Sequence, residues 1–134
     1  MLKWILAGCT ATAGLTGVAL ADEVWTSNQG DIVYVGDNNN DAIFAFTYYN
    51  GQDAAIILPG FTRQWDYRHT NLGVWISQVG NACDSEMVHA SGVRGTSWGK
   101  VKIEWAKTTG PSDFVLTTGD CEAEPTVKLW AKAK

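Results

Sequence analysis

The sequence predicts an all-β fold, a small antiparallel β-sandwich or closed barrel of seven to eight short strands. Nearly every apolar segment is short, is rich in β-branched and aromatic residues, and is bounded by Gly, Asn, Asp or Pro. No segment repeats its apolar residues at helical spacing. Turn signals also recur between these segments, as an antiparallel arrangement requires.

Three strands are expected in the first half of the chain, joined by two turns. Their ranges are 31–35, 42–49 and 54–58. The first turn is the Asn/Asp-rich run Asp37 to Asp41, and both residue types tolerate left-handed backbone angles. The second is Asn50-Gly51, the dipeptide that favours a two-residue type I′ turn.

A two-residue turn at Asn50-Gly51 fixes the register of the second hairpin. The numbers of opposing residues then sum to 101, so Phe44 faces Ile57 and Phe46 faces Ala55. Both faces of this hairpin are apolar, which favours a place in the middle of the sheet.

Four more strands are expected downstream, in residues 73–79, 98–105, 114–118 and 125–130. The second of these has the clearest alternation, with Val101, Ile103 and Trp105 on one face and Lys100, Lys102 and Glu104 on the other. Pro125 cannot donate a ladder hydrogen bond and is expected at a strand start. Trp105 and Trp130 are the tryptophans expected in the core.

The first 21 residues read as a cleavable signal peptide. Lys3 gives a positive start, an apolar stretch without acidic residues follows, and Ala19-Leu20-Ala21 offers the small residues that a signal peptidase accepts. Cleavage before Asp22 leaves one domain, residues 22–134. We therefore expect a periplasmic or secreted protein with no membrane span after processing.

Two other interpretations of the leader stay open. Leu6-Ala7-Gly8-Cys9 has the form of a lipoprotein cleavage box, although the apolar stretch before Cys9 is short for an export signal. A retained transmembrane anchor is the other, since the apolar stretch approaches the lower limit for spanning a bilayer. Each would tether the domain to a membrane.

The charge of the expected mature chain argues against nucleic acid and anionic membrane surfaces as partners. Nine basic and fourteen acidic side chains give a net charge of −5. Nucleic acids and anionic membranes both need clustered Lys and Arg, so neither is expected as a partner. The oligomeric state is left open.

Cys83 and Cys121 are the only cysteines after the leader, and in an oxidising compartment they predict a disulfide. The loop they close is worth about 4 kcal/mol in a chain-entropy treatment. The sequence has no Cys-x-x-Cys pair that would indicate redox chemistry. It also has too few metal-ligating residues near these cysteines to form a metal site.

No catalytic or cofactor motif is complete. The run from Gly95 to Val101 lacks the spacing and the hydroxyl of a phosphate-binding loop, and no Gly-x-Ser-x-Gly elbow occurs. His69 and His89 stand in no zinc or triad spacing. The Asp37 to Asp41 run resembles the start of a calcium loop without its glycine and distal Glu. We expect no metal, no cofactor and no enzymatic activity.

Two segments are candidate binding surfaces. The first places aromatic side chains at alternate positions between cations, and its candidate binding residues are Arg63, Trp65, Tyr67, Arg68 and His69. Trp, Tyr and Arg concentrate at protein interfaces, and aromatic rows also stack on sugars. Trp65 and Tyr67 could equally belong to the core. The second is Cys83 to Ser97, the longest stretch without strand signals.

These observations leave two function classes. The first is an exported, non-catalytic binding module of the cell envelope, an inhibitor or accessory factor that recognises a protein partner. The second is a carbohydrate-binding or small-ligand-binding β-domain that uses exposed Trp and Tyr or a barrel cavity.

Overall fold

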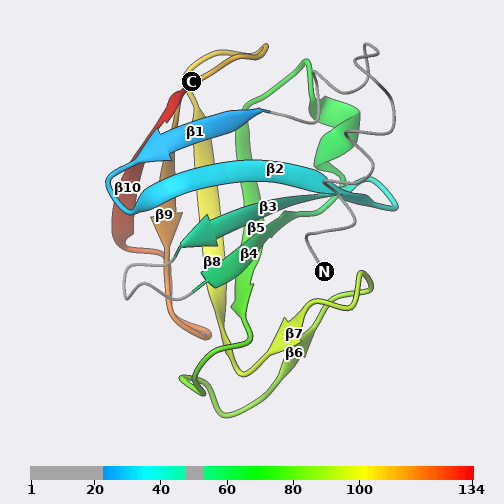
Figure 1. Ribbon diagram of the computed structural model, residues 1–134, viewed down its shortest axis with the longest axis vertical. Coiled ribbons are helices and arrows are strands. Elements are labelled where there is room, and N and C mark those ends of the chain that lie inside the picture. The colour runs from blue at the N-terminus through cyan, green and yellow to red at the C-terminus, as the bar shows by residue number, and fades with distance from the viewer. Residues whose placement is uncertain (1–22, 48–52) are drawn as a thin grey trace.

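The computed structural model describes residues 23–47 and 53–134, which form a closed barrel of eight antiparallel strands (Figure 1). The barrel strands are β1 (Val24–Ser27), β2 (Gly30–Asn38), β3 (Asp41–Thr47), β4 (Asp53–Leu58), β5 (Thr70–Ser77), β8 (Ser97–Trp105), β9 (Phe114–Thr118) and β10 (Val127–Ala133). A short 3-10 helix, η1 (Phe61–Gln64), follows β4, and β6 (Met87–Val88) pairs with β7 (Arg94–Gly95) outside the barrel. The predicted all-β class is confirmed, and the architecture is the barrel.

The strands follow the order β1-β10-β9-β8-β5-β4-β3-β2 around the barrel. β1 closes it, because this strand pairs with β10 on one side and with β2 on the other. Sequence patterns did not reveal β1, which has only four residues. In this closed order β8, β9 and β10 lie opposite β2, β3 and β4, so the molecule has two opposed outer faces.

Aromatic side chains fill the barrel interior. The ring of Trp25 on β1 lies 5.4–5.9 Å from the rings of Phe44, Trp105 and Phe114, measured between centroids. Its indole N–H donates to the carbonyl of Ser112 at 2.8 Å, so the one polar atom of this buried ring is satisfied. The interior is therefore a packed core, as is usual for a barrel of this strand number.

A second apolar cluster lies outside the barrel wall. Ile57 on β4, Ile76 on β5 and Trp98 on β8 point outward, and Cys83 and Val93 pack over them. The last two belong to residues 78–96, which connect β5 to β8 and which we call the strap. The strap explains why β3 and β4 are apolar on both faces: one face lines the interior, and the strap covers part of the other.

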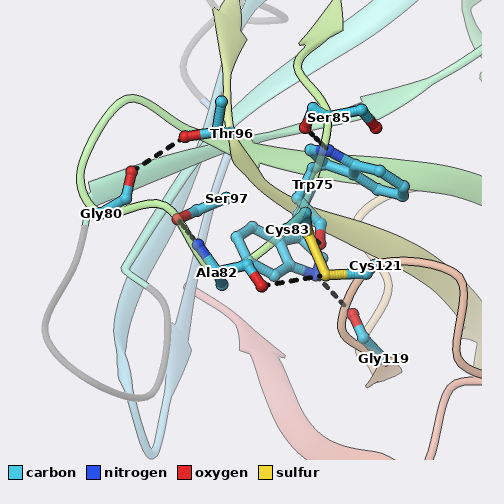
Figure 2. Close-up of a disulfide and its surroundings, with 10 residues drawn as sticks. Trp75, Gly80, Ala82, Cys83, Ser85, Thr96, Ser97, Gly119 and Cys121 are labelled. Atoms are coloured by element: carbon cyan, nitrogen blue, oxygen red, sulfur yellow. Dashed lines mark hydrogen bonds between the residues drawn. A yellow bond between two sulfur atoms is a disulfide. The ribbon is translucent and has the colours of Figure 1, made fainter.

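The Cys83–Cys121 disulfide fixes the base of the strap (Figure 2). The two Cα atoms are 5.6 Å apart, which confirms the predicted bridge. Close by, the Trp98 indole N–H donates to the Ser85 carbonyl at 2.8 Å. A disulfide of this kind is typical of an oxidising, extracytoplasmic compartment.

Gly95 lets the strap approach the barrel. A Cβ atom at this position would lie 1.9 Å from the carbonyl oxygen of Ser77, at the end of β5. No other residue type fits that spacing without a shift of backbone atoms. The strap is therefore seated on the barrel by backbone as well as by side-chain contact.

The predicted register of the β3–β4 hairpin is wrong by one residue. Phe44 pairs with Ile56 and Phe46 with Ala54, so the numbers of paired residues sum to 100. The described part of this ladder ends with the pair of Thr47 and Asp53. The expected Asn50-Gly51 turn lies outside the described residues.

The predicted turn between β2 and β3 is confirmed. Asn38 pairs with Asp41, and the two residues between them, Asn39 and Asn40, have φ angles of 50° and 75°. Two successive positive φ angles are the mark of a type I′ turn, which Asn tolerates well. A hairpin turn thus accounts for the run that resembled a calcium loop.

The prediction that Trp130 belongs to the core is wrong, since its side chain is 67% exposed. On β10 the inward residues are Leu129 and Ala131, and Trp130 points away from the barrel between them. Trp105, by contrast, packs half-buried against the core as expected, and Val101 and Ile103 are buried as the alternation of β8 predicted.

Candidate functional site

The first predicted surface, residues 63–69, is not a strand, so its aromatic residues do not form one row. It begins in η1 and continues as a turn. Trp65 faces the core, with its ring centroid 4.7 Å from that of Tyr34 and 5.5 Å from that of Phe61. Tyr67 is 69% exposed, and Arg63 and His69 are exposed as well. Binding by these exposed residues stays a prediction.

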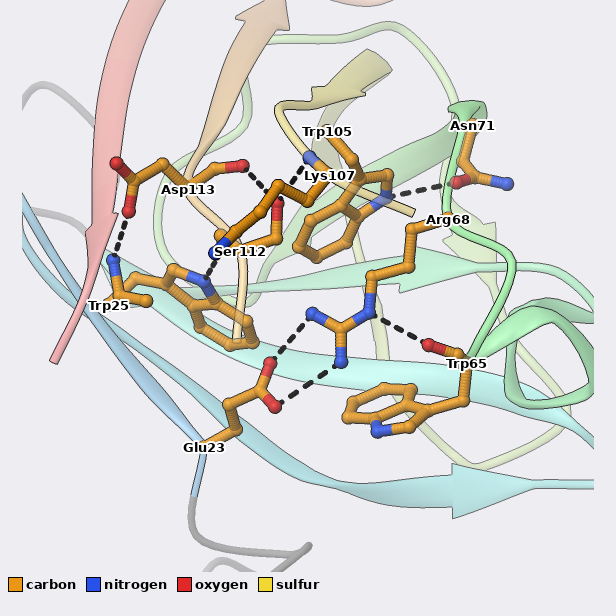
Figure 3. Close-up of polar contacts among 10 residues, drawn as sticks. Glu23, Trp25, Trp65, Arg68, Asn71, Trp105, Lys107, Ser112 and Asp113 are labelled. Atoms are coloured by element: carbon orange, nitrogen blue, oxygen red, sulfur yellow. Dashed lines mark hydrogen bonds and ion pairs between the residues drawn. The ribbon is translucent and has the colours of Figure 1, made fainter. Parts of the chain in front are cut away.

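Arg68 lies on the inside of the same segment, fully buried (Figure 3). Its Nη1 and Nη2 atoms donate to the Glu23 carboxylate at 2.8 and 3.2 Å, and its Nε donates to the Trp65 carbonyl at 2.9 Å. The guanidinium also lies 4.6 Å from the ring centroid of Trp65 and 4.8 Å from that of Trp105. Protein groups therefore use every nitrogen of this cation, and its role is to close one end of the barrel.

The second predicted segment contributes to a cavity. A groove of about 450 Å³ runs between the strap and the outer face of β2, β3 and β4. Its apolar lining comes from barrel residues Val35, Ile43, Ala45, Ala55 and Ile76, and from strap residues Val79 and Val93. Asn38, Asp53, Gln78 and Ser91 add polar groups around it. An apolar pocket of this size with a few polar groups has the usual form of a small-molecule site.

The strand pairs show how the groove is oriented. Asn38 pairs with Asp41 at one end of the β2–β3–β4 surface, and Asp53 pairs with Thr47 at the other. The apolar residues Ile43 and Ala45 lie between them on β3. The groove therefore has an apolar middle and polar ends.

A hydrogen bond between His89 and Asp41, which we call the latch, joins the strap to the barrel at the β2–β3 turn, where one end of the groove lies. The Nε2 atom of His89 on the strap lies 2.8 Å from the Asp41 carboxylate. The other ring nitrogen, Nδ1, accepts a hydrogen bond from the Ser91 backbone N–H at 3.1 Å and lies 2.8 Å from the Ser91 hydroxyl. With Nδ1 as an acceptor, Nε2 is the ring nitrogen that donates to Asp41.

Asp41 is held in its charged form by this latch. The hydrogen bond from His89, and after it the backbone N–H of Gly60, lower the pKa of the Asp41 carboxyl below its ordinary value. Sequence reasoning missed the latch and treated His89 as an ordinary loop residue. Asp41 and His89 are 48 positions apart, and no motif joins them.

Ser91, His89 and Asp41 are linked in the order of a catalytic triad, but the bonds of Ser91 belong to the turn of the strap. Its hydroxyl accepts from the Val93 N–H at 3.4 Å, and its own N–H is used by His89. These hydrogen bonds join the tip of the strap to the β2–β3 turn.

Other chemistry finds little support in the part of the chain that the structure describes. Residues 23–47 and 53–134 contain no group of three or more His, Cys, Asp or Glu side chains placed to hold a metal ion. Within the same ranges, no helix has the length and apolar character needed to cross a membrane. No family model, curated protein or solved structure matches the chain.

Proposed function

We propose that this protein is an exported binding module whose ligand is a small, largely apolar molecule held in the groove between the strap and β2–β4. The observation that carries the proposal is the groove itself, an apolar cavity of about 450 Å³ with polar groups at its ends. This volume lies within the range of about 300–1,000 Å³ typical of ligand sites. Of the classes that the sequence leaves open, small-ligand binding is the one that this geometry favours.

The location of the groove supports binding over catalysis. Its floor is a rigid sheet, and its other wall is a strap pinned by a disulfide at its base and by His89–Asp41 near its tip. A wall fixed at two points keeps the cavity open before the ligand arrives, which lowers the entropy lost on binding. We assign the Ser91–His89–Asp41 bonds to this structural role.

Export rests on two independent features. Residues 1–21 have the three parts of a cleavable signal, and Cys83–Cys121 is a disulfide. N-terminal sequencing of the protein recovered from its native compartment tests the proposal. We expect Asp22 as the first residue. An intact Met1 would contradict export, and a lipid-modified Cys9 would contradict cleavage after Ala21.

Binding is tested with two apolar probes, N-phenyl-1-naphthylamine by fluorescence and dodecanoic acid by displacement of the first. We expect saturable binding of one probe molecule per chain. The blocking variant is Ala45→Phe, because Ala45 lies half-buried on the groove floor and a phenyl ring there would fill the cavity. We expect at least a tenfold loss of affinity.

The matched control is Thr26→Phe, which adds the same ring to an exposed position on β1, outside the groove. Its affinity should equal that of the wild type. Equal affinity in Ala45→Phe, or no saturable binding of either probe to the wild type, would overturn the proposal.

A further inference from the structure

The face opposite the groove carries an exposed tryptophan among lysines. Along β10, Lys128, Trp130 and Lys132 alternate with the inward residues Leu129 and Ala131, so all three point outward. Lys128 pairs with Thr117 of β9, and Thr117 pairs with Lys102 of β8, which places a second lysine in the same outward row. Trp130, 67% exposed, thus has ammonium groups around it on the same surface.

Positive charge is concentrated on this side of an acidic protein. The chain carries a net charge of −4, yet four of the six lysines after Lys3 point outward from β8 and β10, namely Lys100, Lys102, Lys128 and Lys132. Lys102, Lys128 and Lys132 form no ion pair with another described residue, while Lys100 is 3.9 Å from the largely exposed Glu124. Glu104 on β8 is the one acidic residue among the outward side chains of these three strands.

Thr117 adds a polar group without a partner. Its residue is 4% exposed, and its hydroxyl makes no hydrogen bond with any described residue. The strand pairs put it in register between Lys102 and Lys128. An unsatisfied buried hydroxyl is uncommon and unfavourable, and a ligand could bond to it only if the side chains that shield it from solvent moved aside.

We propose that the outer face of β8, β9 and β10 binds an acidic polysaccharide. The indole of Trp130 would stack on the apolar face of one sugar ring, and the ammonium groups of Lys102, Lys128 and Lys132 would pair with carboxylate or sulfate groups along the polymer. This surface is separate from the groove, so the proposal does not rest on the function proposed above.

The spacing of the charges favours a polysaccharide over nucleic acid. Lys128 and Lys132 are four residues apart on one strand, roughly 13 Å, and Lys102 is two strands from Lys128, roughly 10 Å. Such spacing suits a polymer with one charge per sugar or per disaccharide. Duplex DNA has a charge every ~1.7 Å along its axis, a much closer spacing than that of the lysines on this face.

The arrangement also favours a polysaccharide over a membrane surface. Lys128 and Lys132 lie on either side of Trp130 along the same strand. Insertion of the indole into a bilayer would draw both ammonium groups toward hydrocarbon, where a charge is unfavourable. A sugar ring can stack on the indole while both lysines stay in water.

The test is titration of the full mature protein with sodium polygalacturonate, with neutral dextran as the uncharged control. We expect binding to polygalacturonate that weakens as salt is raised, and none to dextran. Trp130→Ala should lose at least tenfold in affinity, and the double variant Lys128→Gln/Lys132→Gln should lose affinity and much of the salt dependence. Val88→Ala, at an exposed apolar residue on the strap and outside this face, should bind as the wild type does.

Three results would overturn the proposal. One is wild-type affinity in Trp130→Ala. Another is loss of binding in Tyr67→Ala but not in Trp130→Ala, because Tyr67 is equally exposed and lies in the 63–69 segment. The third is sedimentation with phosphatidylglycerol vesicles, or capture of an oligonucleotide, without binding to polygalacturonate. Urea unfolding of each variant verifies that it is folded.

Discussion

The two opposed faces of the barrel use the same strand geometry to different ends. On β3, β4 and β5 the outward residues include Ile43, Ile57 and Ile76, and the strap packs over this side. On β8 and β10 the outward residues include Lys102, Lys128 and Trp130, which is 67% exposed. The inward residues of both sides are alike, since all belong to one apolar core.

The difference teaches that outward residues decide what each side of a barrel can do. An apolar outer face must be covered, and the β5–β8 connection does so through residues 78–96. The strap leaves the groove between itself and β2–β4. The outer face of β8, β9 and β10 has no such cover, so its charged and aromatic side chains lie in solvent. Four predictions test this contrast, from the largest expected effect to the smallest.

Removing the disulfide, which anchors the strap, should cause the largest loss of unfolding free energy. The double variant Cys83→Ala/Cys121→Ala should lose about 4 kcal/mol of unfolding free energy, because the bridge closes a long loop in the unfolded chain. Urea unfolding measures the loss, and reduction of the wild type should reproduce it. A loss near that of an ordinary surface change, about 0.5 kcal/mol, would contradict the role given to the bridge.

Two outward residues of β5 provide a direct comparison of covered and uncovered positions. Ile76 is buried beneath the strap and Leu72 is 69% exposed. Ile76→Ala should reduce the unfolding free energy by about 2–4 kcal/mol, since it removes buried methyl groups and leaves a cavity. Leu72→Ala should change it by no more than about 0.5 kcal/mol. Equal losses in urea unfolding would show that the strap does not bury this strand.

Breaking the His89–Asp41 hydrogen bond should cause a smaller loss of unfolding free energy, and this loss should depend on pH. His89→Ala removes a hydrogen bond to Asp41 and should reduce the unfolding free energy by about 1 kcal/mol at neutral pH. The pKa of Asp41 is lowered in the folded state, so its contribution is present above its ordinary value of 3.8 and is lost as the pH falls through the lowered pKa.

Unfolding measured between neutral pH and pH 2 checks this effect. The wild type should lose more stability over the acidic part of the range than His89→Ala does, because Asp41 keeps only its bond from Gly60 in the variant. Parallel acid profiles of the two proteins would contradict the latch.

The smallest change is expected on the uncovered side. Trp130→Ala removes a large ring, but one that is 67% exposed, so the unfolding free energy should change by no more than about 0.5 kcal/mol. Urea unfolding followed by far-UV circular dichroism measures it. A loss of several kcal/mol would mean that Trp130 is packed after all.

Much of the fold could be predicted from the sequence, because the alternation of apolar and polar residues along a strand and the residue types of turns are local properties. The buried Val101 and Ile103, the Asn39-Asn40 turn and the disulfide follow directly from residue types and spacing. The exposure of Trp130 could have been predicted as well. It shares its strand parity with Lys128 and Lys132, and two lysines rarely point into a core.

The rest depended on contacts between distant segments. The His89–Asp41 latch and the groove join the strap to strands far from it in the sequence, and no local pattern encodes them. Trp65 and Arg68 were included in a candidate surface because their residue types are common at interfaces, with a core position left open for Trp65. Tertiary packing placed both against the core, where the same residue types also satisfy one another.

The ion pair between Arg68 and Glu23 would limit where a leader could be removed. If export removes residues 1–21, Glu23 becomes the second residue of the secreted polypeptide. A peptidase that cut two residues further along would discard the carboxylate and strand a guanidinium in the protein interior, where its 0% exposed side chain has no access to solvent. If the leader is removed, the folded domain would therefore tolerate a cut before Glu23 and not one after it, a limit separate from the small residues that the enzyme recognises.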